Sequence, residues 1–145
     1  MVQGLVLDHE GRPLPKDQEQ NQRIAALIDE ATKLPGSLFV MGKGPQAVME
    51  GWVQTKELQV YLKGDWLAVE SGAWHCHLNV SEIDEFRFVQ EPDVHDAKRD
   101  AYSLRLLGKG GEPLLMVFFS MYDRGGKFLS DRVDSFSALK EKYSQ

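Results

Sequence analysis

The segment Trp74-His75-Cys76-His77-Leu78-Asn79-Val80 carries the side chains of this sequence that are best suited to chemistry. Side chains on a β-strand alternate between its two faces, so His75 and His77 share one face while Cys76 lies on the other. We expect the apolar face, with Cys76, to point into the core. The two imidazoles then stand about 7 Å apart, twice the rise per residue. Such a pair could ligate a metal, coordinate a haem iron, or be purely structural.

The same alternation excludes two other chemistries. Cys76 lies opposite both histidines, so it cannot form a local cysteine–histidine nucleophilic pair or join them as a third metal ligand. A bare transition-metal site needs three or four ligands, and no spacing brings His95, His9 or a carboxylate to this strand. No nucleophile elbow marks a serine hydrolase either.

Composition indicates one folded domain spanning residues 1–145, with 42% hydrophobic and 27% charged residues. We expect a cytoplasmic protein without membrane insertion, because there is no long apolar run, no secretory pattern at the N-terminus and only one cysteine. The net charge is −5 and the basic residues are scattered. Nucleic-acid binding is therefore not expected.

Hydrophobic periodicity predicts a helix near each end of the chain. The first has apolar residues at helical spacing: Ile24, Leu27, Ile28, Ala31 and Leu34. Asp17 is its candidate cap, and Leu34-Pro35-Gly36 ends it. The second has a similar apolar stripe: Leu129, Val133, Phe136 and Leu139. Ser130 or Asp131 is its candidate cap.

Between these helices, short apolar or alternating segments separated by turns predict a meander of about six or seven antiparallel strands. The segments interpreted as strands lie at residues 58–63, 66–69, 73–80, 85–89, 101–107 and 113–121, and two shorter apolar groups lie at 37–41 and 48–53. Gly64-Asp65 is a hairpin signal, and Gly108-Lys109-Gly110-Gly111 lacks the spacing of a phosphate-binding loop and is expected to be a turn. Strands between terminal helices predict an α+β fold built on antiparallel sheet.

The last of these strands is unusual because every residue from Leu114 to Phe119 is apolar. A strand with one wet face would alternate, so we expect this strand to be covered on both sides. The two helices can cover one face. Either a second subunit or a flat apolar ligand must cover the other.

The order of these motifs resembles the bacterial haem-utilisation proteins, the cytoplasmic haem carriers of the HutX/ChuX kind and one half of the HemS/ChuS kind. The resemblance begins at about Leu27 and includes the helix end at Leu34-Pro35 and the closing helix at 128–143. The strand motifs that carry it are Trp74-His75-Cys76-His77-Leu78-Asn79, Phe86-Arg87-Phe88-Val89, Ser103-Leu104-Arg105-Leu106-Leu107 with Gly111, and Val117-Phe118-Phe119. Two residues differ from the pattern of the family. Met116 stands where a lysine is common in the family, and Gln54 stands near the position where some carriers have a histidine.

This resemblance implies the HemS/ChuX-like fold and a cytoplasmic haem-binding protein for haem trafficking, storage or utilisation. Haem needs an apolar slab, an axial ligand and cations for its propionates. The residues that could form the site are His77 or His75 as ligand; Phe86, Phe88, Phe118, Phe119 and Met116 as wall; and Arg87, Arg99 or Arg105 for a propionate. We expect His77 to bind the iron because it directly precedes Leu78-Asn79, with His95 or Tyr102 next in line.

Two alternatives to a carrier stay open: a haem-degrading enzyme of the same fold, and a binding or structural module that has lost its ligand. The resemblance to single-repeat carriers and the doubly apolar strand also predict a homodimer. A haem-donor or haem-acceptor protein would be a further partner.

Overall fold

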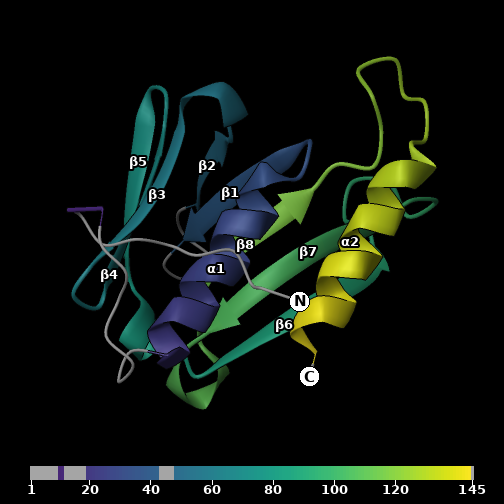
Figure 1. The fold of residues 1–145 in the computed structure, drawn as a ribbon. Coiled ribbons are helices and arrows are strands. Elements are labelled where there is room, and N and C mark those ends of the chain that lie inside the picture. The colour runs from purple at the N-terminus through teal and green to yellow at the C-terminus, as the bar shows by residue number, and fades with distance from the viewer. Residues whose placement is uncertain (1–9, 12–18, 43–47, 145) are drawn as a thin grey trace.

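Two helices flank a run of eight strands in the part of the chain that the computed structural model describes, residues 10–11, 19–42 and 48–144 (Figure 1). The helices are α1 (Glu19–Lys33) and α2 (Ser130–Tyr143). The strands are β1 (Ser37–Gly42), β2 (Val48–Trp52), β3 (Leu58–Lys63), β4 (Trp66–Ser71), β5 (Trp74–Asn79), β6 (Glu85–Pro92), β7 (Asp100–Leu107) and β8 (Pro113–Phe119). The predicted α+β class is confirmed. The candidate cap Asp17 and His9 lie outside the described residues.

The antiparallel strands divide into two sheets, a detail that the sequence pattern did not predict. A five-stranded sheet has the order β2-β1-β8-β7-β6, and a three-stranded sheet has the order β3-β4-β5. The chain leaves the smaller sheet at Asn79, whose side chain accepts a hydrogen bond from the backbone N–H of Ser81 (3.1 Å). This bond begins a single 3-10 turn, Val80–Glu82, that leads into β6. A side-chain-to-backbone bond of this kind competes with continued strand pairing.

Both helices lie on the same side of the five-stranded sheet (Figure 1). Helix α1 buries Ile24, Leu27 and Ile28, and these side chains share one core with the inner faces of both sheets. Cross-strand partners point to the same face. The inner face of the three-stranded sheet therefore contributes Val69 and Cys76, which are paired in register, to this core.

The end of α1 agrees with the sequence prediction. The helix ends at Lys33, and the Ser37 hydroxyl donates hydrogen bonds to the carbonyls of Ala31 (2.9 Å) and Leu34 (2.6 Å). The single hydroxyl hydrogen is shared between the two carbonyls at the end of the helix, and the Ala31 carbonyl also accepts from the Leu34 N–H (3.2 Å). Gly36 has a φ of +75°, which glycine adopts at low cost.

Helix α2 begins differently from the prediction. Leu129 is its N-cap and makes no side-chain capping bond, so neither Ser130 nor Asp131 caps the helix. The backbone fixes this end instead, because the Leu129 N–H donates to the Met121 carbonyl (2.8 Å) and the Arg132 N–H donates to the Leu129 carbonyl (3.1 Å). Hydrogen bonding to the end of the sheet thus replaces the side-chain cap.

Phe136 packs α2 against the five-stranded sheet. Its ring is 4% exposed and lies 5.2 Å from Tyr102, 5.6 Å from Phe119 and 5.7 Å from Phe88, measured between ring centroids. All three contacts are edge-to-face, an arrangement that aromatic pairs favour. No helix in the described part of the chain is long and apolar enough to cross a membrane.

We expect Phe136→Ala to lower the free energy of unfolding by about 3–5 kcal/mol, because it leaves a cavity between α2 and three aromatic rings. Phe128→Ala is the matched control, since that side chain is 49% exposed, and its loss should be about 1 kcal/mol or less. Denaturant unfolding followed by circular dichroism measures both. Equal losses in the two variants would contradict this placement of α2.

Candidate functional site

The outer face of the five-stranded sheet, away from both helices, carries an apolar strip at its centre. In the register of β1 and β8, Leu38 is paired with Phe118 and Val40 with Met116. Paired residues point to the same face. The opposite face of β8 holds the core residue Val117, which is fully buried. Strand β8, which is apolar on both faces, therefore packs under the helices with one face and contributes to the apolar strip with the other.

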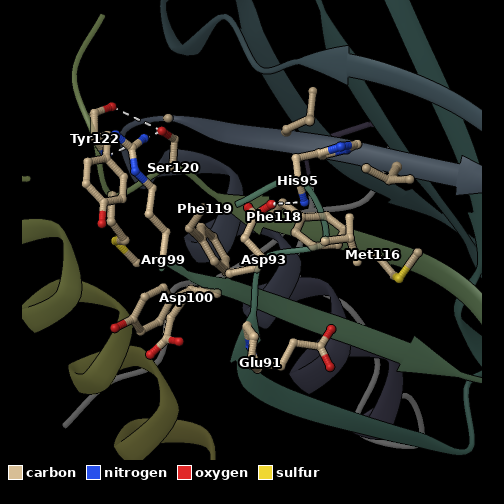
Figure 2. A pocket seen from close by; sticks show the side chains of 18 of the residues that line it. Glu91, Asp93, His95, Arg99, Asp100, Met116, Phe118, Phe119, Ser120 and Tyr122 are labelled. Carbon is tan, nitrogen blue, oxygen red and sulfur yellow. Dashed lines mark hydrogen bonds between the residues drawn. The ribbon is translucent and has the colours of Figure 1, made fainter. Parts of the chain in front are cut away.

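A cavity of about 660 Å³ lies over this strip (Figure 2). Cofactor and small-molecule sites have volumes of about 300–1,000 Å³. Its apolar residues include Leu38, Val40, Met116 and Phe118, with Trp52 of β2 beside them. Its charged residues are Glu50, Glu91, Asp93, Asp100, Asp123 and Arg99. We call the five carboxylates the acidic rim; the cavity thus joins an apolar wall to a negative border.

The connection between β6 and β7, the 93–99 loop, carries His95 to this cavity (Figure 2). The Asp93 carboxylate accepts hydrogen bonds from the backbone N–H groups of His95 (2.7 Å) and Asp96 (3.3 Å). The Asp93 N–H donates to the Arg99 carbonyl (2.9 Å), and the Arg99 N–H donates to the Asp96 carbonyl (3.0 Å). These bonds fix the loop backbone, so an exposed imidazole is held at the cavity by a defined turn.

Arg99 lies at the end of the same loop. Its guanidinium is 4.0 Å from the centre of the Tyr122 ring and its Nε is 3.4 Å from the Asp96 carboxylate. Stacking on an aromatic ring orients a guanidinium without using up its hydrogen-bond donors. Arg99 is the arginine that lines the cavity, as Figure 2 shows, and it can receive an anionic group there.

Arg105 and Arg87 are directly opposite each other on the outer face of β7 and β6, beside the cavity rather than in its lining. Arg87 pairs with Glu85 (2.5 Å), which raises the arginine's pKa through the hydrogen bond and the opposite charge. Arg105 pairs with Glu91 of the acidic rim. Among the described residues, the Arg105 Nε is the one buried side-chain nitrogen or oxygen atom without a hydrogen-bond partner.

Tyr102 borders the cavity but belongs to the core. Its ring packs on Phe136, and its hydroxyl accepts a hydrogen bond from the Gln90 side chain (3.1 Å). Burial, followed by the charges of Asp100 and Tyr122, raises the pKa of Tyr102. A phenol held neutral in this way is a poor anionic ligand for iron.

The aromatic wall predicted from the sequence divides between two faces. Phe118 and Met116 line the cavity from the outer face. Phe86 and Phe88 are paired with core residues of β7, so they point to the helix side instead. Phe119 also has its ring in the core, against Phe136, although it borders the cavity.

The two predicted ligand histidines lie elsewhere. His75 and His77 are exposed on the outer face of β5, in the three-stranded sheet, and neither lines the cavity. Cys76 between them is buried, 3% exposed, which confirms the predicted register of this strand. The structure therefore brings Arg99, Tyr102 and Phe118 to one cavity together with His95, while His75 and His77 form a separate pair.

Sequence reasoning ranked His95 behind His77 and overlooked Asp93. The available signal was local: an aspartate two residues before a histidine, in a polar connection between strands, is typical of a turn closed by the aspartate side chain. That signal predicts a fixed loop but not what the loop covers. In the described part of the chain, no group of three or more histidine, cysteine, aspartate or glutamate side chains could hold a bare metal ion.

Comparisons with known proteins agree on the kind of fold. A protein-family model matches residues 29–143, and no curated protein sequence matches the chain. The structure of the haem-binding protein ChuX matches with a TM-score of 0.69 and 12% identity, over 87% of this chain and 76% of that chain.

Two longer proteins match over about a third of their length. They are apo-PhuS, a haem-binding protein from Pseudomonas aeruginosa (TM-score 0.59, 18% identity, 81% of this chain and 33% of that chain), and ChuS, an E. coli haem oxygenase (TM-score 0.60, 17% identity, 82% of this chain and 35% of that chain). At these identities the likeness establishes the fold.

The register of β5 predicts an unreactive thiol. Burial raises the pKa of Cys76 from 9.0 to about 11. At pH 8 this lowers the thiolate fraction about a hundredfold, and burial also blocks access. We expect a disulfide reagent to label native Cys76 at least a hundredfold more slowly than the urea-unfolded chain, measured by absorbance of the released thiol. Comparable rates in both states would contradict the register.

Proposed function

The chain belongs to the ChuX/HemS-like family of haem-utilisation proteins, and on that premise we propose that it binds haem in the cavity beside the 93–99 loop and carries it within the cytoplasm. The observation that carries the proposal is the cavity itself. It places an apolar strip, a histidine and an arginine around one space of about 660 Å³. Haem requires these three kinds of contact.

The residues present fit this group. Met116 and Phe118 would contact the apolar macrocycle, and Arg99 would pair with one propionate. Arg105 is a second candidate cation, because its buried Nε lacks a hydrogen-bond partner among the described residues and its partner Glu91 lines the cavity. The acidic rim would repel a propionate elsewhere. Bound haem would supply an iron centre whose properties depend on the axial ligand and on the polarity around it.

His95 is the axial ligand that the cavity favours. It is the histidine that lines the cavity, and the Asp93 turn fixes its backbone. Assignment of the iron to His77 stays a prediction, and it requires haem to lie on the outer face of the three-stranded sheet. Mutation of each histidine distinguishes the two assignments, because His77 lies in the three-stranded sheet and His95 lies in the 93–99 loop.

Replacing each histidine tests the ligand. We expect apo-protein to show a saturable change in haem absorbance at about one haem per chain. His95→Ala should shift the Soret maximum and weaken binding at least tenfold, because axial coordination dominates the spectrum. His77→Ala and His75→Ala are the matched controls and should leave the Soret maximum nearly unchanged. The reverse pattern would assign the iron to His77, and no saturable change in the wild type would refute haem binding.

A reductant distinguishes a carrier from a haem-degrading enzyme. In air-saturated buffer, which supplies the oxygen that ring opening consumes, the Soret band of a loaded carrier persists after an electron donor is added. Loss of that band with formation of an opened-ring product would support the enzyme alternative instead. The carrier is our first choice because the apolar strip, His95 and Arg99 that line the cavity are residues suited to binding.

We also propose a homodimer. Strand β2 lies at the edge of the five-stranded sheet and exposes Val48, Met49 and Trp52 by 58, 71 and 59%. Unpaired apolar edges favour pairing with another chain. A two-fold contact there would cover the edge beside the cavity.

Light scattering of apo-protein at tens of micromolar tests this assembly. We expect a mass of twice 16.4 kDa. Met49→Glu should shift the mass toward the monomer, because it places two carboxylates at a two-fold contact, whereas Trp66→Glu in β4 of the three-stranded sheet, where the side chain is also exposed, should not. A wild-type mass of 16.4 kDa would contradict the dimer.

A further inference from the structure

The His75–His77 pair takes no part in the cavity, and its geometry calls for a separate explanation. The two ring centroids are 5.2 Å apart and the ring planes meet at 69°. Both side chains are exposed on the same face of β5. Both imidazoles are therefore accessible from solvent, unlike Cys76 between them.

This separation matches a chelate. An ion bound tetrahedrally to two imidazole nitrogens, each at about 2.0–2.1 Å, holds the two ring centres roughly 5 Å apart. The rings can therefore reach one ion through small side-chain rotations, without a change in the strand backbone. Pairing of β5 with β4 over its whole length holds that backbone in place.

Two residues of β4 lie opposite the histidines on this face. His77 is paired with Ala68, a small side chain, and His75 is paired with Glu70. Glu70 accepts a hydrogen bond from the Tyr61 hydroxyl through its Oε1 atom (3.0 Å). This bond holds the Glu70 carboxylate to Tyr61.

From this geometry we infer that His75 and His77 form a two-imidazole site for a divalent transition-metal ion of the Zn²⁺ or Cu²⁺ class, with water completing the coordination. Imidazole nitrogen favours these ions over Mg²⁺ and Ca²⁺, which prefer oxygen ligands. The site offers two protein ligands, because the described residues hold no group of three or more metal-ligating side chains, and water supplies the remaining ligands that a four-coordinate ion needs. It is independent of the proposed haem cavity.

Calorimetric titration of haem-free protein with Zn²⁺, repeated with Cu²⁺, tests the inference. We expect one ion per chain, and His75→Ala and His77→Ala should each weaken binding at least tenfold, because either change leaves a single imidazole. The double variant should bind the ion about as weakly as the weaker of the two single variants, because each single change already removes the chelate.

The other two histidines provide matched controls. His95→Ala and His9→Ala should keep wild-type zinc affinity, and circular dichroism should show that all variants are folded. Wild-type affinity in His75→Ala and His77→Ala, or loss of binding in His95→Ala or His9→Ala instead, would overturn the site. Mg²⁺ binding as tight as Zn²⁺ binding would also overturn it. Because the titration contains no haem, failure to bind zinc would leave the haem proposal unaffected. Failure to bind haem would likewise leave the zinc site unaffected.

Discussion

The fold depends on the fact that two helices cover only one face of a five-stranded sheet. Side chains of β8 alternate, so burial of Leu115, Val117 and Phe119 beneath the helices commits Leu114, Met116 and Phe118 to the opposite face. That second set is apolar too. The sequence therefore holds an apolar surface that the chain's own helices cannot cover, and the cavity lies over it.

The connections around this surface determine what can bind there. The 93–99 loop adds His95 and Arg99, each held by backbone or ring contacts within or beside the loop. Five carboxylates stand at the border of the cavity, so an anionic group would be repelled except beside Arg99. A flat apolar ligand with few anionic groups suits this combination, while the outer face of the smaller sheet carries a separate pair of imidazoles.

Local patterns in the sequence predicted the elements and their faces. Helical spacing located α1, two-residue alternation fixed the register of Cys76, and an unbroken apolar run marked both faces of β8 as apolar, of which the helices cover one. Long-range pairing was less accessible. The division into two sheets and the helix-side placement of Phe86 and Phe88 follow from which strands pair, and periodicity within one strand does not encode that choice. For the same reason, the sequence could not show that a connecting loop brings His95 to the strip beside β8.

The central claim is that the outer face of the five-stranded sheet, and not that of the three-stranded sheet, holds the ligand. Amide chemical-shift mapping with gallium protoporphyrin, a diamagnetic haem analogue, tests it most directly. The account predicts that the largest shifts fall on β1, β8 and the 93–99 loop, with small changes at His75 and His77. Largest shifts along β4 and β5, with the 93–99 loop unaffected, would contradict it.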